Sequence, residues 1–299
     1  MISGNIGELA ALGTAFGWTF SSIFFEFSGK RVGSLSVNYI RLITAFILIS
    51  ILTFFTRGSF LPIDASSNNW IFLSISGFIG FFIGDLFLFQ SYLEIGSRIS
   101  MLIMAGSPPI TALLGYLVFG EELSLISLFG MSITLIGIAV VILGRDSNEE
   151  KLKVNYSIKG IVYALLGSIG QAVGLIFSKV GMEGYNIFAS TQIRIITGFI
   201  SFTIFIIYLK KWDDVKAAFK DRKAMTVITL GAIAGPFLGV SLSLLSLQYT
   251  SAGISSTITA IVPVTIIPIS IWVFKEKIKP KEILGAIVTV IGVGVLFLY

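Results

Sequence analysis

The chain lacks cysteine and histidine, and it carries few charges for its length. With no cysteine among its 299 residues, it forms no disulfide and offers no thiolate as a nucleophile or metal ligand. With no histidine, it lacks the commonest proton carrier near neutral pH and the commonest metal ligand. Charged residues make up 12% of the chain, against roughly 25% in soluble domains. We therefore expect no metal site, no cofactor, no hydrolase with a histidine base, and no soluble globule.

What the chain has instead is long apolar runs. Hydrophobic residues make up 55% of it, and the mean hydropathy is +0.94. Ten crossings at about 20 residues each leave room for short loops only. We predict an all-α polytopic membrane protein with ten transmembrane helices, at residues 6–28, 35–56, 69–92, 97–118, 123–143, 157–178, 185–209, 224–247, 251–273 and 279–298.

The sequence also contains an internal repeat in two copies. Moving residues 77–143 along by 155 positions aligns them without a gap on residues 232–298, and the superposed pairs include Gly80 with Gly235, Gly84 with Gly239, Pro108 with Pro263, Glu121 with Glu276, Gly130 with Gly285 and Gly137 with Gly292. We predict a first repeat at 1–143, a linker at 144–156 and a second repeat at 157–299. Five spans per repeat make the second repeat enter from the opposite face. Inverted repeats are typical of secondary transporters, whose substrate site lies between the halves.

Lysine and arginine predict the orientation. They gather in the loops after spans one, three, five, seven and nine, and the opposite face has little beyond Arg57 and Lys179. The positive-inside rule then places both termini outside the cytoplasm, in a multi-pass protein of the cytoplasmic (inner) membrane. The net charge of +5 is thereby explained without nucleic acid. Residues 210–223 are either a short amphipathic helix on the membrane surface or a solvated loop.

Several segments resemble a known family. The first repeat has PPITALLGYLVFGEELS at 108–124, and the second has PVTIIPISIWVFKE at 263–276, each followed by two glycines seven residues apart. These segments, with Trp18 and Arg41 in one copy and Gln171, Lys179 and Arg194 in the other, resemble the EamA-type repeat of the drug/metabolite transporter superfamily. The resemblance implies a ten-helix basket around a central cavity that exports or exchanges small metabolites. Members of the family usually have a basic residue near the end of the first helix of each repeat. The second copy has Lys179 there, and the first copy has Glu26 instead.

The strongest candidate for a functional group is Asp85, which lies about 12 Å from the end of its span at 1.5 Å per residue. Ionisable groups at mid-helix are expensive and need a reason. The second copy has Val240 at this position. Asp85 is either a proton-coupling or cation-binding group, or it is paired with a buried arginine or caps a broken helix.

Further polar residues in the spans have two interpretations each. Trp18, Ser22 and Glu26 share a helix face and form either part of a cavity wall or, for Glu26, an ion pair with Arg41. Arg41 and Arg194 occupy matching positions and either anchor helix two to helix one or act at the site. Lys179 and Arg194 pair with Glu183 or with an anionic group of the substrate. Gln90 and Gln171 contact substrate or join helices.

Glycines and prolines predict packing and bending. Small residues let membrane helices approach closely, and prolines within spans make kinks. We expect spans three, four, eight and nine to bend at hinge or packing residues, which are Gly80, Gly84, Pro108, Gly235, Pro236, Gly239, Pro263 and Pro268. In the small multidrug-resistance relatives, similar last helices form the dimer contact. The resemblance therefore implies that Gly130, Gly137, Gly285 and Gly292 hold the two copies together.

The sequence thus favours a secondary active transporter over an enzyme. Its expected partners are a small-molecule substrate such as an amino acid, the lipid bilayer and, if Asp85 and Glu26 are proton-linked, protons. The alternative is a non-transporting membrane enzyme or scaffold protein. Because fused copies complete a basket without a partner, we expect a monomer.

Overall fold

The computed structural model describes residues 6–120, 122, 124–145, 152–154, 156–249, 258–276 and 278–296. Its first half contains the helices α1 (Ile6–Val32), α2 (Ser34–Arg57), α3 (Ser67–Ser76), the π-helical segment η2 (Gly77–Gly84), α4 (Asp85–Met104), α5 (Ser107–Phe119) and α6 (Leu125–Ile142). Strands β1 (Leu143–Arg145) and β2 (Leu152–Val154) form an antiparallel pair, and all of β2 and most of β1 lie within the predicted linker.

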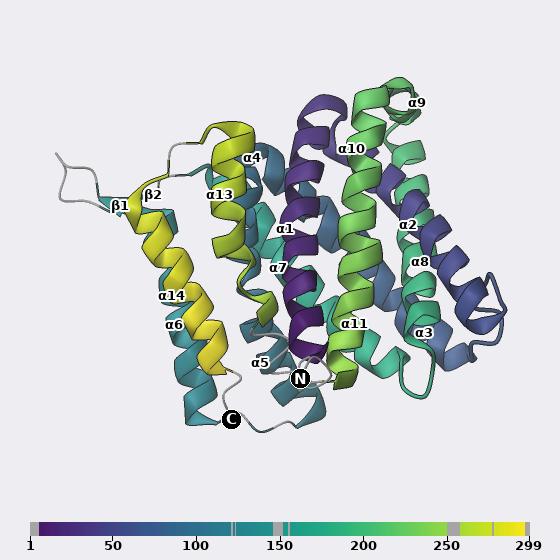
Figure 1. The fold of residues 1–299 in the computed structure, drawn as a ribbon, viewed down its shortest axis with the longest axis horizontal. Coiled ribbons are helices and arrows are strands. Elements are labelled where there is room, and N and C mark those ends of the chain that lie inside the picture. The colour runs from purple at the N-terminus through teal and green to yellow at the C-terminus, as the bar shows by residue number, and fades with distance from the viewer. Residues whose placement is uncertain are drawn as a thin grey trace.

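The second half contains α7 (Ile158–Gly181), α8 (Ile187–Tyr208), α9 (Trp212–Lys220), α10 (Arg222–Ala232), the π-helical segment η3 (Ile233–Gly239), α11 (Val240–Tyr249), α13 (Val262–Phe274) and α14 (Pro280–Leu296). The helices run side by side in one bundle, and the start of α1 and the end of α14 lie at the same edge of it (Figure 1). The part of the chain that the structure describes therefore has helices and, apart from the short β1–β2 hairpin, no strands.

Among the described residues, six helical stretches are long and apolar enough to cross a membrane: Ser34–Arg57, Ser67–Met104, Leu125–Ile142, Ile158–Gly181, Ile187–Tyr208 and Arg222–Ser243. Two shorter apolar helices, Ser107–Val118 and Val262–Phe274, accompany them. α1 is not among the six, and it places Thr14, Thr19, Ser22 and Glu26 in the interior. The apolar helices and the many exposed Leu, Ile and Phe side chains are those of a multi-pass membrane protein.

The predicted break between spans three and four is confirmed by Gly96. Its φ of 79° and ψ of 156° interrupt the helical backbone within α4, and a positive φ of this kind favours glycine. The corresponding break predicted at 248–253 lies mostly outside the described residues. The expectation of mid-helix kinks at Pro108 and Pro263 was wrong. Both lie in the first turn of their helices, where the missing N–H needs no intrahelical partner.

The two π-helical segments occupy matching places in the two repeats. η2 covers 77–84, and the shift of 155 positions carries it onto 232–239, where η3 covers 233–239. π-helical turns are rare and concentrate at functional sites. η3 contains Pro236, whereas Pro268 lies inside α13.

Each π-helical segment packs on the first helix of the other repeat. η2 lies against α7, where a Cβ added to Gly170 would be 2.7 Å from the Cα of Gly84. η3 lies against α1, where a Cβ added to Gly17 would be 2.5 Å from the carbonyl oxygen of Ala234. The exchange of partners is reciprocal, so the two repeats interlock through backbone contacts that only glycine permits.

The last helices of the repeats, α6 and α14, also pack closely. A Cβ at Gly130 would lie 2.8 Å from the carbonyl oxygen of Gly292, and one at Gly137 would lie 2.8 Å from that of Gly285. Hydroxyl groups fit the same seam, since Ser127 Oγ donates to the carbonyl oxygen of Leu296 at 3.2 Å. These four glycines therefore lie at one helix–helix contact between the repeats.

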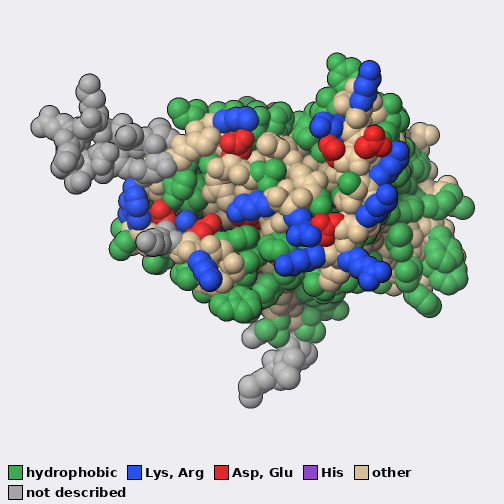
Figure 2. All heavy atoms as spheres, turned by 90° about the horizontal axis from the view of Figure 1, so that it is seen from above, with side chains coloured by type: hydrophobic (Ala, Val, Ile, Leu, Met, Phe, Trp, Pro, Cys, Tyr) green, Lys and Arg blue, Asp and Glu red, His purple; other side chains and the backbone are tan. Residues whose placement is uncertain are grey.

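Basic side chains gather on the face seen from above in Figure 2, which includes α9 and the ends of α1 and α13. Exposed members are Lys30, Arg31, Lys211, Lys216, Lys220, Lys275 and Lys279. The predicted amphipathic helix is present as α9, so the alternative of a plain loop was wrong. Its apolar side is turned to the bundle: Val215 is buried, and Trp212 packs edge-on against Tyr39 at 5.3 Å.

Alanine substitutions at the α7–η2 contact test this packing. We expect Gly170→Ala to lower stability by about 1–3 kcal/mol, because the new methyl group meets the backbone of Gly84. Gly80→Ala is the matched control, since the nearest atom to its Cβ is 3.5 Å away, at the end of the Arg194 side chain. Thermal unfolding of the purified variants measures both. Equal destabilisation by the two substitutions would contradict this packing.

Candidate functional site

A buried ion pair lies in the middle of the bundle. Asp85, the first residue of α4 after η2, pairs with Nη2 of Arg41 from α2. Asp85 is 5% exposed and Arg41 is 4% exposed. The guanidinium of Arg41 also lies 4.6 Å from the ring centroid of Phe89. The sequence-based alternative of an Asp85 paired with a buried arginine is therefore what the structure contains.

Two amides complete the hydrogen bonds of this pair. Gln171 of α7 donates from Nε2 to Asp85 Oδ1 at 2.7 Å and to the carbonyl oxygen of Gly80 at 3.3 Å. Asn38, one turn before Arg41, accepts from Arg41 Nε at 3.0 Å and donates to the backbone carbonyl of Asp85 at 3.3 Å. Gln171 reaches Asp85 because the glycine contact brings α7 close to η2. The site therefore joins α2 and α4 of the first repeat to α7 of the second.

Arg194, the counterpart of Arg41, lies at the edge of this cluster. Its guanidinium carbon is 4.3 Å from the ring centroid of Phe81, and it is within electrostatic reach of Asp85. Its Nε atom is buried, and no described residue accepts a hydrogen bond from it. The predicted partner Glu183 lies in the turn after α7, and the described residues show no ion pair between it and Arg194. Asp85 is thus paired with Arg41 alone, and Arg194 feels its charge from a greater distance.

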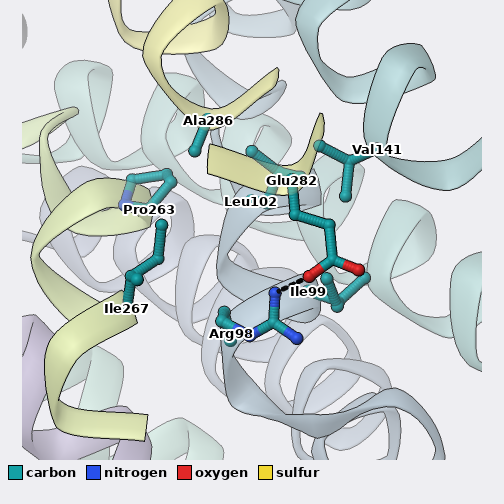
Figure 3. Close-up of a pocket in the computed structure, with 8 residues that line it drawn as sticks. All are labelled: Arg98, Ile99, Leu102, Val141, Pro263, Ile267, Glu282 and Ala286. Carbon is teal, nitrogen blue, oxygen red and sulfur yellow. Dashed lines mark hydrogen bonds and ion pairs between the residues drawn. The ribbon is translucent and has the colours of Figure 1, made fainter. Parts of the chain in front are cut away.

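A second charged cluster surrounds Arg98. Arg98, just after the Gly96 break, donates from Nε to Glu276 at 2.8 Å and from Nη1 to Glu282 at 2.6 Å. Glu282 lies in the first turn of α14 and also accepts from the Tyr156 hydroxyl at 2.7 Å. Figure 3 shows Arg98 pointing to Glu282 across a pocket lined by Ile99, Leu102, Val141, Pro263, Ile267 and Ala286.

The charges of this second cluster join the two repeats. Burial and the hydrogen bond to Glu282 raise the pKa of Tyr156, so that its phenol stays a donor at neutral pH. Glu276, which matches Glu121 of the first repeat, binds Arg98 through its carboxylate. The equivalent Glu121 lies outside the described residues.

Glu26 lies at the basic face and does not pair with Arg41. Its carboxylate accepts from the backbone N–H of Ser97 at 2.6 Å and from Lys30 Nζ at 2.5 Å. The first bond places a negative charge at the start of the helical stretch after Gly96, where the helix dipole favours it. The alternative of a Glu26–Arg41 ion pair was therefore wrong. Glu26 is fully buried, and its neighbour Lys30 is half exposed.

The other candidates lie apart from the central cluster. Trp18 packs on η3, with ring atoms 3.6–3.7 Å from the Cβ positions of Gly235 and Gly239. Ser22 is buried and bonds to the carbonyl oxygen of Thr19 at 2.9 Å. Gln90 accepts from Ser34 at 2.9 Å, as a bridge between helices. Lys179 is exposed in the last turn of α7.

Sequence reasoning assigned no site role to Asn38, Arg98, Glu282 and Tyr156. Asn38 carried a usable signal, since it is polar, within a span, and three residues before Arg41. Arg98 was counted only as a basic loop residue. Its pairing with Glu282 joins positions 184 residues apart, and no local pattern reveals it.

Comparison with known proteins places this architecture in a family. The profile of the EamA-like transporter family matches residues 5–143 and again 158–298. The chain belongs to the EamA-like transporter family. This family is part of the drug/metabolite transporter superfamily, as the sequence motifs predicted. An uncharacterized transporter of Archaeoglobus fulgidus is 23% identical over 297 residues, covering 97% of each chain.

A solved crystal structure shares the fold of this EamA-like chain. The TM-score is 0.62 at 12% identity, and the alignment covers 97% of this chain and 95% of the other. Identity at this level supports the fold alone. Family membership and the named relative identify a multi-pass membrane transporter with a small-molecule substrate, in preference to the alternative of an enzyme or scaffold.

The buried ion pair predicts a specific pattern of stability. Asp85→Leu leaves both Arg41 and Arg194 without a carboxylate, and we expect a loss of about 3–5 kcal/mol. The double variant Arg41→Met/Asp85→Leu removes one of those unpaired charges, so it should be more stable than Asp85→Leu alone. Arg31→Met, which breaks the exposed pair with Asp221, should change stability by about 1 kcal/mol or less. Unfolding midpoints in detergent measure these effects. A double variant less stable than Asp85→Leu would contradict the pairing.

Proposed function

We propose that this EamA-like protein is a secondary transporter that exports or exchanges small metabolites, amino acids among them, by alternating access. In this proposal, ten helices form two inverted five-helix repeats, at 1–143 and 157–299, around a solute path. The observation that carries it is the reciprocal packing of α1 on η3 and α7 on η2, with the Arg41–Asp85 cluster at the seam. Inverted repeats place their substrate site at such a seam.

The second support is an asymmetry between the repeats. On the basic face, Arg98 of the first repeat binds Glu276 and Glu282 of the second, which holds that end closed. Within the repeats, α2 packs on α4, whereas the described parts of α8 and α11 make at most a marginal contact. Rocking between two such unequal arrangements would open the path to one face at a time.

The driving force in this proposal is a solute gradient or exchange. The sequence has no phosphate-binding loop that would couple transport to a nucleotide. Proton coupling through Asp85 requires protonation of a carboxylate that Arg41 and Gln171 hold by charge and hydrogen bonds. Coupling by Asp85 therefore demands that the pair with Arg41 separates during the cycle. The hinge glycines Gly84 and Gly239 adjoin the two π-helical segments that would bend.

The orientation follows from the charges. The basic face would lie in the cytoplasm, with both termini on the opposite side of the cytoplasmic membrane. The α6–α14 contact lies within one chain, which supports a functional monomer.

Breaking the ion pairs of the basic face tests alternating access. We expect Arg98→Gln to lower the initial rate of amino-acid uptake or exchange in proteoliposomes by about tenfold, because two charge-assisted hydrogen bonds stabilise the closed state. The matched control is Arg57→Gln, which breaks the ion pair of Arg57 with Asp64 at 2.6 Å near the other face and should stay within about twofold of wild type. Uptake by Arg98→Gln at the wild-type rate would contradict a gate at this place.

A further inference from the structure

The central cluster contains more positive than negative charge. Arg41 and Arg194 occupy matching positions in the two repeats, but only the first repeat supplies an acid, Asp85; the second has Val240 there. Arg41 takes up the Asp85 carboxylate, and Gln171 donates to its other oxygen. Both carboxylate oxygens of Asp85 therefore have a donor, whereas the buried Nε atom of Arg194 has no hydrogen-bond partner among the described residues.

An arginine in this state is expensive in a membrane protein. Its planar group carries five N–H donors and stays charged at any physiological pH. Phe81 covers one face of the guanidinium at 4.3 Å, which leaves the donors at its edge available. Buried donors without partners lower stability, so an arginine kept in this place needs an acceptor that arrives from outside.

No side chain from position 80 stands beside Arg194, because that residue is glycine. Gly80 of η2 faces its Nη2 atom, and a Cβ added there would be 3.5 Å from that nitrogen. The carbonyl oxygen of Gly80 is already bound by Gln171, so the backbone does not satisfy the guanidinium. Arg194 also keeps part of its surface accessible, unlike Arg41.

We propose that Arg194 binds the anionic group of the transported solute, a carboxylate or a phosphate monoester, at the seam between η2, α7 and α8. This inference rests on the proposed transport function and names its substrate class. The anion would bind the edge of the guanidinium in the bidentate geometry that arginine favours, and it would neutralise the second cation as Asp85 neutralises the first.

The test is ligand-dependent thermal stability of the purified chain. The probes are L-lactate for a carboxylate, glycerol 3-phosphate for a phosphate monoester, L-alanine for a zwitterion and choline for a cation, at equal ionic strength with chloride as reference. We expect an anionic probe to raise the unfolding midpoint and choline not to. The lactate and phosphate arms distinguish the two sources of negative charge.

Variants tie that binding to Arg194. Arg194→Gln should weaken the apparent affinity for the anionic probe by about tenfold or more, and Arg57→Gln should leave it unchanged. Arg194→Lys keeps the charge but loses the planar fork, and it should bind several-fold more weakly than wild type. If Arg194→Gln does not fold, Arg194→Lys is the variant that tests the site. Stabilisation by choline alone, unchanged anion affinity in both variants, or no anionic binding up to about 10 mM would overturn the proposal.

Flux separates this proposal from the transport function. Suppose that proteoliposomes take up a neutral or cationic solute at a rate that depends on Arg98 and that Arg194→Gln does not change. The transport function is then supported and the anion site is contradicted. If anions bind through Arg194 and no solute crosses the proteoliposome membrane, the anion site is supported and the transport function is contradicted.

Discussion

The burial of Arg41 against Asp85 is the constraint on which the rest of the bundle depends. Neither charge is tolerated alone in an apolar interior, so α2 and α4 must meet at one register. Gln171 and Asn38 then satisfy the remaining hydrogen bonds of the pair, which brings α7 into the same place. α7 reaches it only because the glycines of α7 and η2 let the two backbones touch. One ion pair thus fixes the approach of three helices from both repeats.

Duplication supplies the scaffold, and departures from it supply the chemistry. The π-helical segments, the glycine contacts and the arginines Arg41 and Arg194 occur in both repeats. Asp85 occurs in the first alone, and Arg98, whose contacts form at the basic face, has Gly253 as its counterpart in the sequence of the second repeat. A perfectly symmetric bundle would favour neither face. In the proposed transport cycle, these differences between the repeats would give the two ends different stabilities, as opening to alternate sides requires.

Much of the fold could be predicted from the sequence, and less of the site. Apolar runs and the repeat predicted the helices, and Gly96 marked the break in α4 as expected. The kinks predicted at Pro108 and Pro263 were wrong, because the sequence of an apolar run does not show whether a proline lies in the middle of a helix or in its first turn. Asp85 was found because a charge in a span is conspicuous. The partner of Asp85 was not identified. The sequence suggested Glu26 as a partner of Arg41 because the two are near in sequence, whereas Asp85 lies 44 residues from Arg41. Charge pairing between positions far apart in the sequence depends on tertiary packing.

The central claim is that two fused copies lie upside down relative to each other, and the sidedness of three positions tests it most directly. The chain has no cysteine, so single cysteines in place of Ile2, Asn148 and Tyr299 can be labelled without background. Labelling with a membrane-impermeant thiol reagent, before and after permeabilisation, reports the side of each. The account predicts that positions 2 and 299 react from outside the cell and that position 148 reacts only after permeabilisation. Positions 2 and 299 on different sides, or all three on the same side, would contradict it.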